Sequence, residues 1–377
     1  MNLFKLNLNI QFFCFAIIFM LFEGGGYLGI GGYYAPAIAA VIFIAFLSIF
    51  RHGMVLSQEH LYIAILFVIM VFHLNNSINN IETSRLIWGY ILLFAMFFTL
   101  TLYQPGIEDL KAILNSFIIS TVVISICIIV MLKEYNVSGR YTLDIIEQTD
   151  PNHLASFLAL GLILTLKKTF FSFKKIQKTI YASSSIIILV AMLLTGSRGA
   201  FVSIIFSIPI LFLIKSKKIF IGAFFIIFMF ILSFSILPDY LTDRFVKDSY
   251  NDDSNQIRIK LWFDAIEKIS IHPIIGYGAV RSRNITGIGA AHNTFLAFAL
   301  HFGILGLTMI LLILWKIFRN CLNKDMYLFL AVFVNLMINS IILENTNTMP
   351  FWFTITFLIF AVNFKMRNSK ITLWDKL

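Results

Sequence analysis

Residues 181–214, YASSSIIILVAMLLTGSRGAFVSIIFSIPILFLI, contain a single charged side chain, that of Arg198. As one helix, residues 180–214 would be about 52 Å long at about 1.5 Å per residue, well beyond the ~30 Å hydrocarbon core of a bilayer. The stretch therefore predicts two short helices that reverse at TGSRG, where Gly196 and Gly199 permit the turn. The arginine at this turn either reaches outward to lipid phosphates or faces inward and holds an anionic ligand.

The composition of the whole chain predicts an integral membrane protein. Of its 377 residues, 59% are hydrophobic and 13% are charged, and the mean hydropathy is +0.88. A soluble domain of this length would need far more polar surface. The net charge of +10 does not indicate a nucleic-acid partner, because the lysines lie in short patches between apolar runs. The three cysteines are odd in number and widely spaced, so they predict neither a disulfide framework nor a metal site.

Twelve apolar runs are candidates for spans, each of which needs about 20 mostly apolar residues. The predicted spans are residues 8–22, 33–50, 60–74, 86–103, 110–132, 153–166, 180–196, 198–214, 219–237, 292–315, 326–343 and 350–364. The first is interpreted as a retained span, because no small-residue cleavage site follows it. Residues 1–377 are thus predicted to form a single polytopic, all-α membrane domain.

Lys and Arg concentrate in alternate loops, above all in KKTFFSFKKIQK (residues 167–178) and KSKK (residues 215–218). The positive-inside rule puts these loops and both termini in the cytoplasm. The turn that carries Arg198 and the long loop of residues 238–291 are then expected on the opposite, periplasmic side.

Within this loop, apolar residues recur at every fourth position from Ile257 to Ile269. This spacing predicts an amphipathic helix that lies on the membrane surface or on the bundle. The segment HPIIGYG (residues 272–278) should end it, because proline and glycine break helices. Asp252 and Asp253 have no histidine nearby and do not indicate a metal site.

Polar residues also mark the points where the chain enters the membrane. The imidazole of His292 either accepts a proton from a hydroxyl group at neutral pH or only hydrogen-bonds the end of a helix. Asp150 could cap the sixth span, and His301 is expected to be a packing residue. The topology places Arg198, Arg258, His292, Asp150 and Glu344 on one side of the membrane.

Two arginines and a histidine indicate anion binding combined with proton transfer. The planar guanidinium group suits phosphate. Fixed cations would stabilise the diphosphate that leaves a lipid-linked sugar, while a histidine would accept the proton of the attacking hydroxyl. A lipid-linked oligosaccharide flippase is the alternative from another class, but charged residues should then line a path through its spans. A purely structural subunit would leave the arginines and the histidine unexplained.

Four motifs resemble, in this order, the bacterial O-antigen ligase family, which also contains O-antigen and capsule polymerases. They are DPNHLASFLALGL (150–162), LTGSRGAFVS (194–203), RIKLWFDAIEKISIHPIIGYG (258–278) and AHNTFLAFALHFGILGL (291–307). The resemblance implies a GT-C-like glycosyltransferase of the bacterial inner membrane that needs neither metal nor cofactor. Its donor would be an undecaprenyl-diphosphate-linked glycan.

By motif, the resemblance assigns the donor diphosphate to Arg198 and Arg258, and the acceptor hydroxyl to His292. Further residues expected to contact substrate are Asn293, Trp262, Lys260, Arg281 and Glu344. A ligase would hand the glycan to lipid A–core, whereas a polymerase would hand it to the next lipid-linked repeat unit. We favour the polymerase slightly, with a chain-length regulator as a further candidate partner.

Overall fold

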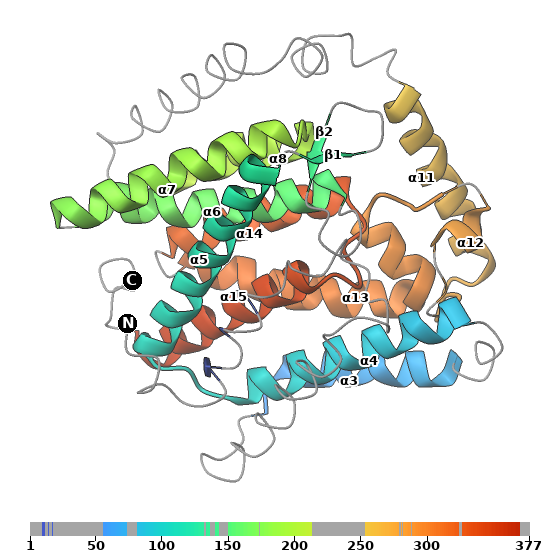
Figure 1. Ribbon diagram of the computed structural model, residues 1–377. Helices are drawn as coiled ribbons and strands as arrows, with labels where there is room; N and C mark the ends of the chain where they lie inside the picture. The colour runs from blue at the N-terminus through green and yellow to red at the C-terminus, as the bar shows by residue number, and fades with distance from the viewer. Residues whose placement is uncertain are drawn as a thin grey trace.

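The computed structural model is built of helices, apart from one short β ribbon (Figure 1). It describes residues 10, 11, 14, 17, 56–73, 81–131, 133–135, 140–142, 150–172, 174–212, 253–278, 280, 282–287, 289–323 and 326–369. The helices are α3 (Gln58–His73), α4 (Ile81–Leu102), α5 (Ile107–Met131), α6 (Pro151–Phe171), α7 (Lys175–Leu194), α8 (Arg198–Phe212), α11 (Asp253–Ile271), α12 (Ser282–Thr286), α13 (Thr294–Asn323), α14 (Tyr327–Ile342) and α15 (Met349–Arg367). The strands β1 (Lys133–Tyr135) and β2 (Arg140–Thr142) pair antiparallel, Lys133 opposite Thr142, and are the one departure of the described chain from the predicted all-α fold.

Nine of the twelve predicted spans coincide with helices in the described part of the chain. Residues 33–50 and 219–237, and most of 8–22, lie outside the described residues. Five of the described helices are long and apolar enough to cross a bilayer, namely α5, α6, α7, α13 and α15. The apolar helices α3, α8 and α14 are shorter, as is the apolar part of α4, Leu86–Leu102.

The predicted reversal at TGSRG is confirmed. Helix α7 ends at Leu194 and α8 begins at Arg198. Gly196 adopts a φ of 60°, in the left-handed region that glycine enters at little cost. After the turn, α8 packs against α14 and α6. Arg198 therefore lies at the beginning of a helix that packs against two others.

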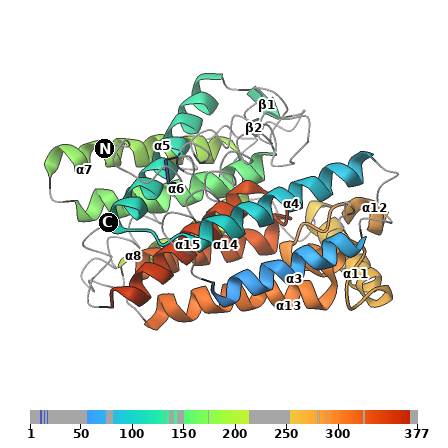
Figure 2. The ribbon, with the colours of Figure 1, turned by 90° about the horizontal axis from the view of Figure 1, so that it is seen from below.

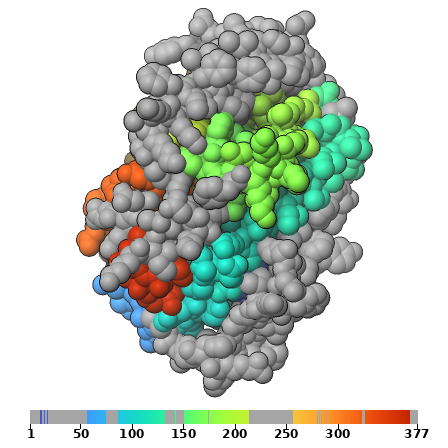
Figure 3. Space-filling model, turned by 90° about the vertical axis from the view of Figure 1, so that its left-hand side faces the viewer, coloured from blue at the N-terminus to red at the C-terminus, as the bar shows by residue number. Residues whose placement is uncertain are grey.

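Because the long helices run side by side, their ends form two opposite faces (Figures 1 and 2). We call the face that carries α11, the α7–α8 turn and the first residue of α13 the site face. The opposite face carries the α6–α7 junction and the end of α15, which Figure 3 shows together in green and red. Basic residues that the positive-inside rule assigned to the cytoplasm lie on this second face: Lys168, Lys174, Lys175, Lys178, Lys365 and Arg367.

Helix α11 confirms the amphipathic helix predicted for the long loop. It ends at Ile271, immediately before HPIIGYG, and runs across the ends of the long helices (Figure 1). Leu261 and Ala265 are buried on its inner side, where Ala265 packs with Ala291 and Leu300. Ile257, predicted for the same stripe, is instead 53% exposed.

The segment of residues 272–278 does more than end α11, because it fills a break in α13. Gly303 interrupts that helix with φ 64° and ψ −167°. Two N–H groups of the segment donate to the carbonyls of Leu300 and His301, at 2.8 and 2.9 Å. In return, its Pro273 carbonyl accepts from the N–H of Ile304 at 2.8 Å. The backbone groups freed by the kink are thus paired inside the protein, as an irregular backbone at membrane depth requires.

We expect Gly303→Ala to lower the free energy of unfolding by about 2–4 kcal/mol. A Cβ atom at this position would lie 2.2 Å from the carbonyl oxygen of Ile274, and the backbone is in the left-handed region. The shift in thermal unfolding of the detergent-solubilised protein measures the loss. Gly287→Ala is the matched control, because Gly287 has φ 75° but no atom within 4 Å of its added Cβ. Equal losses in the two variants would show that the contact with residues 272–278 is unimportant.

Candidate active site on the site face

Direct contacts bring the beginning of α8 to the end of α14. A Cβ atom added to Gly199 would lie 3.1 Å from the side chain of Ile342, the last residue of α14. This close approach needs a small residue next to Arg198 and brings the first turn of α8 to the end of α14. Arg198 is half-buried and makes contacts of its own.

The end of α14 is in turn bonded to the beginning of α13. The Thr294 hydroxyl donates to the carbonyl of Leu343 at 2.7 Å and accepts from the N–H of Asn345 at 3.0 Å. Glu344 Oε2 accepts from the N–H of Ala291, which precedes His292, at 3.0 Å. Arg198 and His292, 94 positions apart in the sequence, therefore lie on the same face of the bundle.

His292 is held in an unusual backbone conformation between two fixed neighbours. Its φ of 46° is the only positive value at a non-glycine residue in the described part of the chain. Ala291 before it is fully buried. Asn293 after it caps α13, since its Oδ1 accepts from the N–H groups of Phe295 and Leu296 at 2.9 and 3.1 Å. Strained backbone of this kind is typical of functional sites.

The electrostatic surroundings of His292 come from α11 and from the beginning of α6. Burial lowers the pKa of this half-buried imidazole below its usual range, and the charge of Arg258 on α11 lowers it further. Asp150, beside α6, raises the pKa and His153 lowers it. The net effect keeps the imidazole neutral near pH 7, the form that can accept a proton from a hydroxyl group.

Asp150 also confirms the predicted helix cap, because its Oδ1 accepts from the N–H of Asn152 at 2.7 Å at the start of α6. The cap places His153 on the first turn of α6, where its charge acts on His292. His153 was not among the residues singled out from the sequence. Its position inside the motif DPNHLASFL was the available signal.

The residues predicted on or after α11 differ in how exposed they are. Arg258 is half-buried, and its positive charge lowers the pKa of His292. Lys260 is exposed. Trp262 is half-buried, and its Nε1 is enclosed without a hydrogen-bond partner. Arg281 lies outside the described residues.

Glu344 is half-buried, and both of its carboxylate oxygens are engaged within the protein. Oε1 accepts from the Ser282 hydroxyl at 2.7 Å, and Oε2 accepts from Ala291. Burial raises the pKa of this carboxyl group. In this structure Glu344 therefore braces the loop that leads into His292, whereas the resemblance assigned it to substrate.

His301 is buried, as expected of a packing residue, and it is also hydrogen-bonded. Its Nδ1 lies 2.8 Å from the hydroxyl of Tyr90, which donates to Thr346 Oγ1 at 2.8 Å. Its Nε2 lies 3.4 Å from Ser282, the partner of Glu344. This chain of polar contacts joins α4, α12, α13 and the segment after α14 behind the site.

We expect Glu344→Ala to lower the free energy of unfolding by about 1–3 kcal/mol, because it leaves the buried N–H of Ala291 without a partner. Glu344→Gln should cost much less, since its amide oxygen can accept from Ala291 while its NH₂ group donates to Ser282. Thermal unfolding of the two variants in detergent makes the comparison. Equal destabilisation would contradict the bracing role of this contact.

We expect Arg258→Gln to move the acidic limb of the pH–rate profile to higher pH. Arg258 lowers the pKa of His292, so removing its charge raises that pKa, and the imidazole becomes protonated and inactive at a less acidic pH. Initial rates between about pH 5 and 8 give the midpoint of the limb. Lys268→Gln in the last turn of the same helix should leave the midpoint in place. A midpoint that stays unchanged in Arg258→Gln would exclude this electrostatic coupling.

In the described part of the chain, no three His, Cys, Asp or Glu side chains are grouped as ligands for a metal ion. The described site offers guanidinium groups on α8 and α11 and an imidazole before α13. Such a set can hold an anion and move a proton.

Comparison with known families agrees with this arrangement. Residues 183–311 match the family model described as O-antigen ligase. The matched part begins within α7 and ends within α13, after the kink at Gly303. It includes Arg198, Arg258 and His292. None of the curated proteins matches the chain. The match supports the O-antigen ligase family that the motifs resemble, and the described part of the chain holds five helices long and apolar enough to cross a membrane.

Proposed function

We propose that the protein is an inner-membrane glycosyltransferase that transfers a glycan from an undecaprenyl-diphosphate donor to a sugar hydroxyl during surface polysaccharide assembly. The observation that supports this most is the surroundings of His292. A half-buried imidazole with a lowered pKa lies under the field of Arg258, on the same face as Arg198. A site that only binds an anion would not need the imidazole, and a site that only accepts a proton would not need the two arginines.

In the proposed reaction, the acceptor hydroxyl oxygen forms a bond to the anomeric carbon of the donor sugar. The bond between that carbon and the diphosphate oxygen breaks, and its electron pair leaves with the diphosphate. His292 accepts the hydroxyl proton. Arg198 and Arg258 neutralise the charge that grows on the leaving group. Attack from the side opposite the diphosphate would invert the anomeric centre.

The charge bias between the two faces supports the proposed orientation in the membrane. The Lys-rich face is assigned to the cytoplasm, and the site face to the periplasm. A donor whose lipid tail lies in the outer leaflet would present its diphosphate at the level of the α7–α8 turn.

The decisive experiment supplies the purified full-length protein with a lipid-linked repeat unit, with and without lipid A–core. The reaction is run in chelator without ATP, because the proposed chemistry uses neither a metal nor a nucleotide. Longer lipid-linked chains formed without the core identify a repeat-unit polymerase, which we favour. Product formed only with the core identifies a ligase. Translocation of the lipid without any new glycosidic bond, or a strict need for a divalent ion, would refute the proposal.

A further inference from the structure

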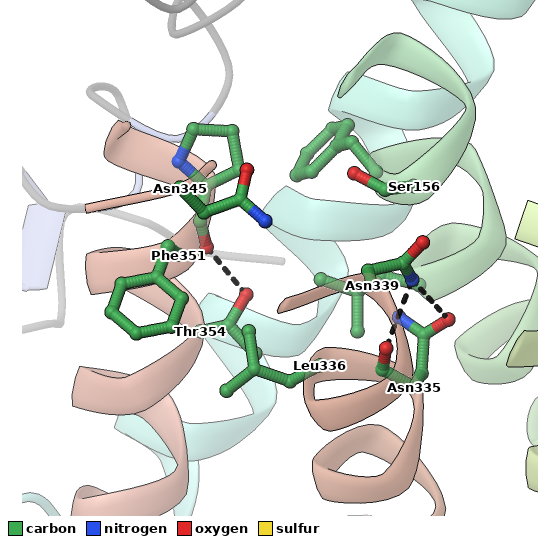
Figure 4. Close-up of a pocket in the computed structure, with 10 residues that line it drawn as sticks. Ser156, Asn335, Leu336, Asn339, Asn345, Phe351 and Thr354 are labelled. Atoms are coloured by element: carbon green, nitrogen blue, oxygen red, sulfur yellow. Dashed lines mark hydrogen bonds between the residues drawn. The ribbon is translucent and has the colours of Figure 1, made fainter. Parts of the chain in front are cut away.

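A small polar cavity lies beside the site, between α6, α14 and α15 (Figure 4). Its space is about 30 Å³, room for about two water molecules, and it opens to the surface. Its polar lining comes from Ser156, Asn335, Asn339, Asn345 and Thr354, and its apolar walls from Phe157, Leu160, Leu336, Pro350 and Phe351. No charged side chain is among these described lining residues.

Three asparagines leave hydrogen-bonding groups unused toward this cavity. Asn335 Oδ1 accepts from the Ser203 hydroxyl at 2.8 Å and from Asn339 Nδ2 at 3.2 Å. The NH₂ group of Asn335, the Oδ1 of Asn339 and the whole side-chain amide of Asn345 have no hydrogen bond within the described protein. In Figure 4 the Asn345 amide points toward Asn339 and Ser156 across the cavity.

The three asparagine residues have little exposed surface. Asn335 and Asn339 are 4% exposed and Asn345 is 6% exposed. The amide groups that lack a partner in the described protein keep contact with solvent in the cavity, because none of them is among the fully enclosed polar atoms without a hydrogen bond in the described chain. Amides with so little exposure are almost always hydrogen-bonded, so these groups are available to water or to a ligand that both donates and accepts.

The cavity is coupled to the catalytic loop through two of its walls. The backbone N–H of Asn345 donates to Thr294, which lies two residues after His292. Ser156 lies one helical turn beyond His153, whose charge acts on His292. A group bound in the cavity would therefore contact residues that are linked to the loop carrying His292.

The lining selects the chemistry of the occupant. A phosphate group would lose its hydration there without a cation to compensate. Amides facing aromatic and aliphatic walls suit a neutral polar group attached to an apolar ring face. A space of about 30 Å³ that opens to the surface would take a small substituent while the sugar ring stays outside. We propose that the cavity is a specificity subsite for a neutral hydrogen-bonding substituent, a hydroxyl or acetamido group, on one sugar of the glycan substrates. This inference rests on the proposed glycosyltransferase function.

Two variants of the full-length protein in lipid nanodiscs test the subsite. Ser156→Phe fills the cavity, and Asn345→Ala removes an amide whose side chain makes no bond within the described protein, so the fold should tolerate it. Ser183→Phe adds the same ring at an exposed position of α7 and serves as the control. The assay uses the lipid-linked repeat unit as donor and its lipid-free glycan as acceptor, and it varies one concentration at a time.

We expect about a tenfold rise in one of the two KM values in both cavity variants, with kcat within about threefold of wild type. A rise in donor KM places the recognised sugar on the donor, and a rise in acceptor KM places it on the acceptor. Unchanged KM values for both substrates, or a loss confined to kcat, would overturn the proposal and leave a cavity that holds only water. An inactive wild-type protein would instead refute the proposed function, so the two failures are distinguishable.

Discussion

His292→Ala should lower the rate of glycan transfer by about 10²–10⁴-fold, the range that a positioned general base contributes. Neither Asn293 nor Ala291 can replace the imidazole, because the first caps α13 and the second is fully buried. The measurement is the initial rate of chain extension with purified protein, supported by the glycan ladder made in cells. Thermal unfolding should stay near wild type, because the half-buried His292 side chain makes no hydrogen bond within the described part of the chain.

The matched control for this substitution is His272→Ala. His272 is exposed in the segment after α11 and lies against the ring of Tyr277, with 4.6 Å between ring centroids. Its loss should change the rate by less than about twofold, because it is not part of the site. A His292→Ala protein that inserts normally and extends chains at a near-normal rate would refute the assignment of the general base.

Arg198→Ala should lower the rate of transfer by about 10²–10³-fold, the usual cost of removing one fixed group that stabilises transition-state charge. The guanidinium lies at the start of α8, where the helix N-terminus adds a partial positive charge that favours the same anion. Arg198→Lys should recover only part of the rate, because the ammonium keeps the charge but loses the planar, two-pronged donor geometry.

Arg319→Ala is the control for Arg198, because Arg319 is exposed on the second half of α13 and belongs to no part of the site. It removes the same charge from the chain and should leave transfer unchanged. If Arg198 only reached lipid phosphates, Arg198→Ala would behave like Arg319→Ala, with altered insertion at most. Full activity in Arg198→Lys would show that a point charge is sufficient and that no bidentate contact is made.

Several features of the fold could be predicted from local sequence because a bilayer imposes them directly. The span length, the reversal at TGSRG and the boundary of α11 at HPIIGYG each depend on a few neighbouring residues and on the thickness of the apolar phase. Asp150 as a helix cap is equally local. The common face of Arg198, Arg258 and His292 also followed, since the number of crossings between them sets the side on which each emerges.

The sequence by itself determined which segments are long and apolar enough to enter a membrane and which polar residues should emerge on one side, because hydrophobic length and charge bias act along the chain. Only the tertiary structure decided what each polar group touches. It turned Glu344 inward to Ser282 and Ala291, brought His153 to His292, broke α13 at Gly303 over residues 272–278, and grouped three asparagines around a cavity. These contacts join residues far apart in the chain, and their energies depend on partners that no local periodicity identifies.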